Sequence, residues 1–238
     1  MVAYPRARSV LRSWIGIGLG CGLLALAHGG PPAAHEPNID TGPAGHAAAT
    51  PAMEAIEQLE LANKLADFGE RQADPVALVE AAKLLKRASA TMPAKGKAEG
   101  MRTWESLLIR ASQLAGSNPT VANLAADVRA YKVRDIPRLD GASMTNKTVK
   151  ADGADRVEVT FHAGQMAMVY VRPTPPVDLD LYVYDEFENL ICSGPNGGHE
   201  SQCRWRPRRD GQFLLDVRNK NNTEVAYVLA INSETMDQ

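Results

Sequence analysis

The stretch PVDLDLYVYDEFENL, residues 176–190, sets the expected fold of the C-terminal half, because it has the two-residue period of a β-strand. Its apolar face carries Leu179, Leu181 and Val183. Residues two apart on a strand point the same way, so Asp178 and Asp180 project together from the opposite face. Three interpretations of this pair of aspartates are open: a solvated surface, half of a cation site, or the signature of a known module.

Six further segments share the two-residue period and are separated by Gly, Pro, Asn and Asp turns. They are RVEVTF, QMAMVYV, NLICS, SQCRWRP, GQFLLDVRN and EVAYVLAIN, at 156–161, 165–171, 189–193, 201–207, 211–219 and 224–232. Seven short strands within about 85 residues predict an all-β sandwich over residues 154–238.

Residues 51–134 instead repeat their apolar positions every three or four residues, which predicts helices. A first apolar stripe runs from Met53 to Phe68, and a third helix is expected near residues 103–115. Asp74-Pro75 and Asn118-Pro119 each place an N-cap before a proline at the first helical position. These two starts are compatible with a duplicated helical hairpin, but we favour a small antiparallel bundle of four helices. The expected fold class is therefore α+β, a helical bundle followed by a sandwich.

The first 27 residues have the features of an export signal. A positive segment with three arginines precedes an apolar run from Trp14 to Ala27, which ends in the small-residue triplet Ala25-Leu26-Ala27. We expect cleavage there and a periplasmic or secreted protein without a membrane span, while an uncleaved anchor is the alternative. Residues 28–50, rich in Gly, Pro and Ala, and residues 135–153 are expected to be linkers.

Charge and cysteine content narrow the expected partners and compartment. The formal net charge of the 238-residue chain is −2, and cleavage would leave 23 basic and 28 acidic residues, or −5. This balance argues against a nucleic-acid partner, which needs a basic surface. Cleavage would also leave only Cys192 and Cys203. In an exported chain such a pair predicts a disulfide, and an antiparallel hairpin would bring the two cysteines together.

The β-rich half resembles the bacterial pre-peptidase C-terminal domain over about residues 154–232. The resemblance lies in FHAGQ, VDLDLYVYDEFENLI, CRWRPRRDGQFLLDVRN and AYVLAI, beginning at residues 161, 177, 203 and 226. It implies an antiparallel, jelly-roll-like sandwich attached to secreted proteins, often proteases, where it aids secretion or substrate binding. It also implies a core position for Trp205. No protease domain precedes the sandwich in this sequence, so a role in the maturation of a protease is not expected.

Asp178, Asp180 and Asp185 are candidate calcium ligands, and calcium is the one cofactor that the sequence suggests. The turn after the strand adds further oxygen donors, and calcium accepts irregular oxygen geometry. The resemblance also implies calcium binding as a possible property of the sandwich. The interpretation that we favour is structural, because aspartates beside turns often bind backbone N–H groups.

An arginine cluster follows in RWRPRR, at residues 204–209. Its members, Arg204, Arg206, Arg208 and Arg209, could bind carboxylates or phosphates of an extracellular polymer. We favour instead a solvated face that balances nearby acids, namely Asp210, Asp216 and those of DEFE at residues 185–188.

No catalytic motif is recognisable in the sequence, which lacks a G-x-S-x-G elbow, an H-E-x-x-H pair and a phosphate-binding glycine loop. Outside the linker only His162 and His199 could act as bases. We therefore expect an exported, non-enzymatic protein whose sandwich is a binding or stabilising accessory module for a protein or a cell-wall polymer. The alternatives are a secreted hydrolase, or its accessory, with a site formed only in the fold, and an envelope scaffold that docks through its helices.

Overall fold

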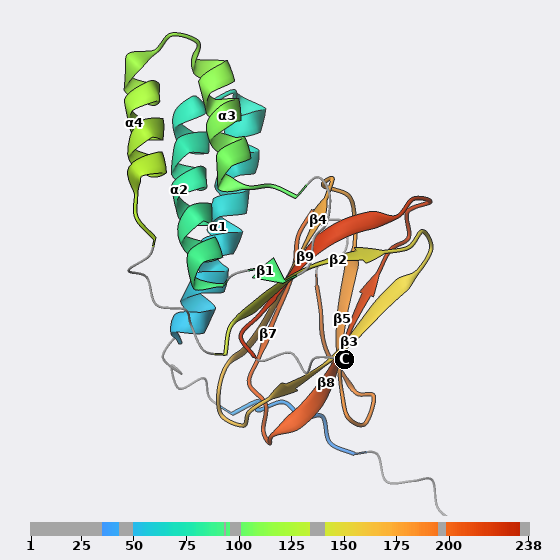
Figure 1. The fold of residues 1–238 in the computed structure, drawn as a ribbon. Coiled ribbons are helices and arrows are strands. Elements are labelled where there is room, and N and C mark those ends of the chain that lie inside the picture. The colour runs from blue at the N-terminus through green and yellow to red at the C-terminus, as the bar shows by residue number, and fades with distance from the viewer. Residues whose placement is uncertain are drawn as a thin grey trace, which may run out of the picture. The chain divides into compact units, whose positions relative to one another are not determined.

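The computed structural model describes residues 35–42, 50–92, 94–95, 101–133, 141–194 and 199–233. All of them belong to one compact unit, and the predicted export signal lies outside them. Four helices precede a sandwich of two sheets, so the expected α+β fold class is confirmed (Figure 1). In the part of the chain that is described, no helix has the length and apolar character needed to cross a membrane.

The four helices begin where their capping residues predict. They are α1 (Pro51–Gln72), α2 (Pro75–Thr91), α3 (Trp104–Ala115) and α4 (Pro119–Ala130). The Asp74 carboxylate accepts hydrogen bonds from the backbone of Val76 and Ala77, and Asn118 accepts one from Thr120. These bonds satisfy N–H groups that the first turn of a helix leaves without partners.

The apolar stripe expected on α1 is correct except at its end, where Phe68 is 44% exposed. Ile56, Leu59 and Ala66 are buried and form the packed face of the helix. Close packing of α1 on α2 depends on Gly69, because a Cβ added there would lie 2.8 Å from the Leu78 side chain. A side chain at position 69 would therefore push the end of α1 away from α2.

The sandwich consists of a five-stranded sheet and a four-stranded sheet. The strands are β1 (Ala94–Lys95), β2 (Ser143–Val149), β3 (Ala154–Phe161), β4 (Ala167–Thr174), β5 (Asp180–Asp185), β6 (Leu190–Ser193), β7 (Ser201–Trp205), β8 (Gly211–Arg218) and β9 (Val225–Ile231). The first sheet has the order β1-β2-β9-β4-β7 and the second β3-β8-β5-β6. All neighbours are antiparallel except β1 and β2, and the seven predicted strands correspond to β3 through β9.

Strand β2 lies within residues 135–153, where the sequence analysis expected a linker. It pairs with β9 along its whole length, from Ser143 opposite Ile231 to Val149 opposite Val225. Only Met144 and Val149 of this strand are buried. The segment therefore lacks the apolar alternation by which the other strands could be recognised, and its β structure depends on the β9 partner.

The core between the two sheets contains the apolar face of the opening stretch. Leu179, Leu181 and Val183 are all buried in it, as expected. Trp205 is also buried there and packs edge-on against Phe161, with ring centroids 4.9 Å apart. The core role expected for Trp205 is thus confirmed.

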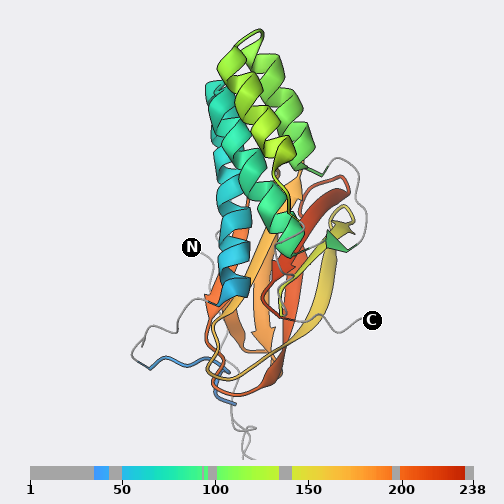
Figure 2. The same ribbon diagram turned by 60° about the vertical axis from the view of Figure 1, so that its left-hand side comes forward.

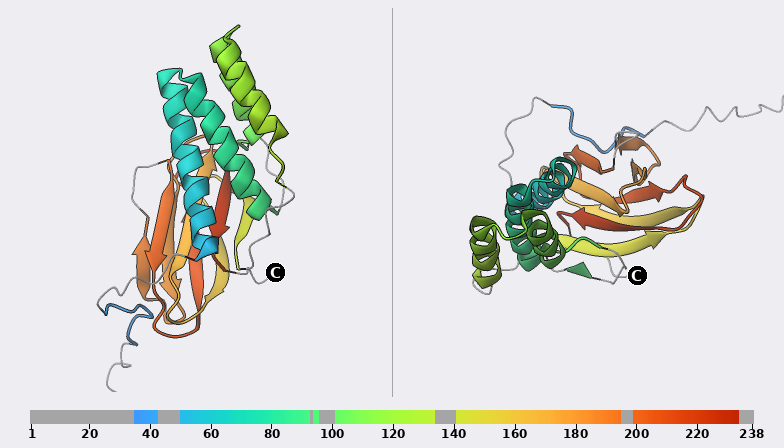
Figure 3. Two further views of the ribbon diagram at one scale, coloured as in Figure 1. Left: turned by 90° about the vertical axis from the view of Figure 1, so that its left-hand side faces the viewer. Right: turned by 90° about the horizontal axis from the view of Figure 1, so that it is seen from above.

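The helices cover the outer face of the first sheet and form a third layer (Figures 2 and 3). Met144, Met168, Tyr170 and Ala230 of that sheet share one apolar cluster with α1, α2, α3 and α4. Strand β4 is consequently buried on both faces from Ala167 to Pro173. The bundle and the sandwich therefore share a core, and the face where they meet can hold a site.

Residues 28–50 were expected to be a flexible linker, but the segment His35–Gly42 lies against the sandwich. Asn38 is fully buried, and its side-chain oxygen accepts hydrogen bonds from the backbone N–H groups of Arg208 and Arg209. Its own N–H donates to Asp185. The Gly, Pro and Ala content of the segment predicted a linker. Composition cannot show the hydrogen bonds that this segment makes to a loop far away in the chain. The rest of this range, apart from Thr50, lies outside the described residues.

Candidate functional site

A buried arginine lies where α1 meets the first sheet. Arg172 is on the outer face of β4, and its side chain is only 4% exposed. Its two Nη groups donate to both carboxylate oxygens of Asp67, at 3.0 and 3.1 Å, and Nη1 also donates to Glu200 at 2.6 Å. A buried guanidinium is tolerated only when it is paired in this way.

Arg102, in the segment before α3, completes the network from the helical side. It donates to Asp67 Oδ1 at 2.6 Å and to the side chain and backbone oxygens of Asn63. The Asn63 amide in turn donates to the Tyr170 hydroxyl at 3.2 Å. Burial alone would raise the pKa of Asp67, but hydrogen bonds from Arg172 and Arg102 outweigh it and lower that pKa.

Glu200 behaves in the opposite way, although it also binds Arg172. Burial raises the pKa of Glu200 and outweighs the attraction of the Arg172 charge. Burial, with the nearby Glu200 charge, also raises the pKa of Tyr170, whose phenol therefore stays neutral. Asp67 is thus the principal counter-ion of Arg172.

Two cavities lie beside this network. The inner one, of about 270 Å³, is lined by Leu59, Asn63, Leu85, Ser89, Met101, Arg102, Thr103, Trp104, Glu105, Met144, Asn146, Arg172, Thr174 and Val228. The outer one, of about 460 Å³, is lined by Glu70, Met101, Arg102, Ser106, Leu107, Arg110, Arg172, Pro173, Thr174 and Pro176. We call the inner cavity the cleft and the outer one the hollow. An apolar cleft with a few fixed polar groups is the usual form of a small-molecule site.

The site could not be identified from the sequence, because its polar residues come from α1, from β4 and from two loops that are far apart in the chain. The only available signal was the run AMVYV at residues 167–171. A run that is apolar at every position indicates a strand buried on both faces. It could have shown that something covers β4, but not which residues do so.

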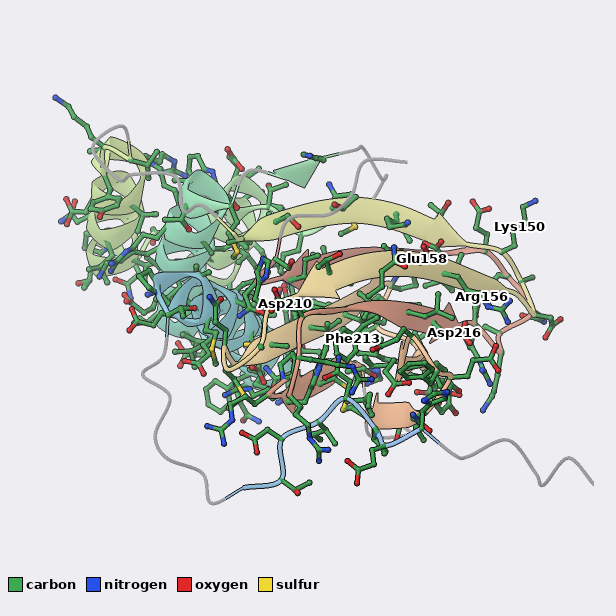
Figure 4. All side chains as sticks on the ribbon, turned by 90° about the horizontal axis from the view of Figure 1, so that it is seen from below. Lys150, Arg156, Glu158, Asp210, Phe213 and Asp216 are labelled. Carbon is green, nitrogen blue, oxygen red and sulfur yellow. A yellow bond between two sulfur atoms is a disulfide. The ribbon has the colours of Figure 1, made fainter. Side chains whose placement is uncertain are left out.

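Each of the four arginines proposed as ligand-binding residues has an acidic partner within the chain. Arg204 pairs with Glu57 and Arg206 with Asp40, both at 2.8 Å, Arg209 pairs with Glu186 at 2.7 Å, and Arg208 binds Glu36. The charge-balanced interpretation of this cluster therefore agrees with the structure: Glu186 is one of the expected acids, whereas the other three partners were not expected. Asp216 lies beside Arg156 on the second sheet (Figure 4). It also binds Arg218, and Asp210 is near His162.

The three candidate calcium ligands do not form one site. Asp180 is buried and pairs with Lys220 at 2.6 Å, whereas Asp178 is exposed. Asp185 lies at the other end of β5 and accepts hydrogen bonds from the backbone of Asn38, Phe187 and Asn189. Five residues of strand separate Asp180 from Asp185 by roughly 16 Å. The described residues contain no group of three or more His, Cys, Asp or Glu that could hold a metal ion.

His162 is exposed, and its Nδ1 lies 3.5 Å from the carboxylate of Asp210. Hydrogen bonds from the Ala163 backbone and from His162 lower the pKa of this exposed acid. Ser233 lines the same surface cavity of about 320 Å³, but its hydroxyl donates to the backbone oxygen of Thr160. The serine is therefore oriented toward the backbone, unlike the nucleophile of a catalytic triad. His199 is exposed on a bend.

The predicted disulfide is present, with the Cα atoms of Cys192 and Cys203 5.9 Å apart. It does not close a simple hairpin as expected, because β6 and β7 belong to different sheets. Both strands are at the edges of their sheets, so the bond joins the two layers on one side of the sandwich.

No protein-family model and no curated protein sequence matches the chain. Among solved structures, the pre-peptidase C-terminal domain of a collagenase from Bacillus anthracis is 14% identical, with a TM-score of 0.35 over 39% of this chain and 90% of that chain. PliG of Aeromonas hydrophila, a periplasmic inhibitor of g-type lysozyme, is 13% identical, with a TM-score of 0.31 over 39% and 85%. Similarity at this level does not establish a family, and the candidate site rests on its own geometry.

Proposed function

We propose that this protein is an exported, non-enzymatic binding protein that holds a small molecule in the cleft between its helices and its first sheet. The observation that carries the proposal is the composition of the cleft. Its lining combines apolar side chains with polar ones that include Arg102 and Arg172; the apolar ones are Leu59, Leu85, Met101, Trp104, Met144 and Val228. This arrangement gives a ligand both a contact surface and a fixed orientation.

The disulfide supports the export part of the proposal, because such bonds persist mainly in oxidising compartments. The motifs of residues 161–231 support the assignment of the sandwich as a pre-peptidase C-terminal-like accessory module. In this arrangement the sandwich supplies one wall of the cleft and the helices supply the other.

A neutral fluorescent probe, N-phenyl-1-naphthylamine, tests the binding function. We expect one saturable site on the folded protein. Ser89 lines the cleft from α2, so Ser89→Trp should fill the cavity and abolish binding. Ser117 lies exposed in the turn between α3 and α4, so Ser117→Trp adds the same side chain elsewhere and should leave binding unchanged. Binding that survives Ser89→Trp, or that never saturates, would refute the cleft as the site.

A further inference from the structure

The cleft and the hollow adjoin, and their walls differ in chemical character. Both are lined by Met101, Arg102, Arg172 and Thr174, so the two cavities meet around these residues. Beyond the shared residues, the cleft continues into the apolar wall around Trp104. A molecule that spans both cavities therefore meets an apolar surface on one side and a charged surface on the other.

The hollow is lined by three arginines and one acid, and two of the arginines already pair with Asp67. Its charged lining residues are Glu70, Arg102, Arg110 and Arg172. Arg110 bonds Glu70 through Nε at 2.9 Å and is 42% exposed, so its Nη groups can donate to a bound group. Guanidinium groups bind planar carboxylates particularly well, because parallel N–H donors match the two oxygens.

Arg172 lines both cavities, and its charge is balanced by Asp67 and Glu200. Its Nε is buried and has no hydrogen-bond acceptor among the described residues, although its Nη groups are paired. The unpaired Nε is therefore a missing hydrogen bond and not an uncompensated charge. A preference for an anion must therefore come from Arg110, which is partly exposed.

On the basis of the proposed binding function, we infer that the ligand is an amphipathic carboxylate. Its apolar chain lies in the cleft against Trp104, and its carboxylate lies in the hollow and accepts hydrogen bonds from Arg110, beside Arg102. Arg102 and Arg172, which are held by Asp67, form the fixed boundary between the two parts. Arg110 determines the preference for an anion because it is the most exposed of the three arginines.

Displacement of N-phenyl-1-naphthylamine by decanoate and by decanol distinguishes the contribution of the head group to binding from that of the apolar chain. We expect decanoate to bind the native protein about tenfold more tightly than decanol, the effect of one partly exposed charge-assisted hydrogen bond. Arg110→Gln should remove that difference, and Arg110→Lys should restore part of it. Arg129 is exposed at the end of α4, away from both linings, so Arg129→Gln is the matched control and should change nothing.

The outcomes distinguish this inference from the proposed function on which it rests. Equal binding of the acid and the alcohol, or a preference that Arg110→Gln leaves intact, overturns the carboxylate assignment while the cleft remains a binding site. Failure of all three molecules to bind overturns both. Bromodecanoate adds a positional test, because a bromine in the cleft should quench Trp104 and the quenching should disappear in Trp104→Phe. Quenching that persists in that variant contradicts the assigned orientation.

Discussion

Asp67 on α1 and Arg172 on β4 form a bidentate ion pair, in which the two carboxylate oxygens accept hydrogen bonds from the two Nη groups at 3.0 and 3.1 Å. The two residues are 105 positions apart in the chain and join the helical layer to the sandwich. Because the Arg172 side chain is almost fully buried, its charge needs counter-ions, and the helix supplies Asp67 in addition to Glu200 beside β7. This pair makes the position of the helices a condition for the stability of the sheet.

The first prediction concerns the two acids that bind Arg172. Asp67→Asn should lower the free energy of unfolding by about 3 kcal/mol, because it leaves a buried guanidinium without its main counter-ion. Glu200→Gln should cost much less, since burial already disfavours the charge of Glu200 and an amide oxygen can still accept from Arg172. Urea denaturation of both variants measures the difference. Equal losses would show that Asp67 is not the principal counter-ion.

The second prediction is a pH dependence in which these acids act in opposite directions. The folded-state pKa of Asp67 is lowered, so its contribution is present above its unfolded value of about 3.9 and is lost as pH falls through the folded pKa. The folded-state pKa of Glu200 is raised, so the folded state holds its proton more tightly. Stability from that group therefore declines as pH rises from about 4.3 through the raised pKa.

Unfolding measured from acidic to neutral pH should resolve the two contributions. Asp67→Asn should flatten the acid limb, and Glu200→Gln should remove the decline above about pH 4.3. Changes of the same sign in both variants would contradict the opposed shifts.

Local periodicity explains why most of the fold could be predicted and why the site could not. Helices α1 to α4 and strands β3 to β9 each have their own apolar repeat or cap, which a single sequence contains. Strand β2 has no such repeat, and the tie between Asn38 and the loop at Arg208 spans 170 residues. Arg172 shares its face of β4 with Met168 and Tyr170, so periodicity indicates that this face is covered but not which residues pair with the arginine.

The third prediction concerns the disulfide. Replacing Cys192 and Cys203 by serine should lower stability by about 3 kcal/mol, the chain-entropy estimate for a loop of this size. Because the bond joins edge strands of different sheets, hydrogen exchange should accelerate first in β6 and β7. Reducing the native protein should reproduce both effects. Unchanged hydrogen exchange in β6 and β7 would mean that packing alone holds the two sheets together on this side of the sandwich.

The last prediction concerns the N-terminal segment and the buried side chain that holds it. Asn38 accepts hydrogen bonds from the backbone of Arg208 and Arg209 and donates to the backbone oxygen of Arg209. A Cβ added at Gly211 would lie 2.7 Å from the Asn38 amide, so the loop fits closely around it. Asn38→Ala leaves two backbone N–H groups without their acceptor and should cost about 1–3 kcal/mol.

Limited proteolysis provides the more specific measurement, because release of the segment should expose residues 35–42 to cleavage while the sandwich stays intact. Glu36→Gln is the matched control. Glu36 is exposed and binds Arg208 only at the surface, so its loss should cost little and leave cleavage slow. Asn38→Asp keeps the acceptor oxygen but loses the donor to Arg209 and should fall between the two. If Asn38→Ala is cleaved no faster than Glu36→Gln, the segment is held by its ion pairs and not by the buried amide.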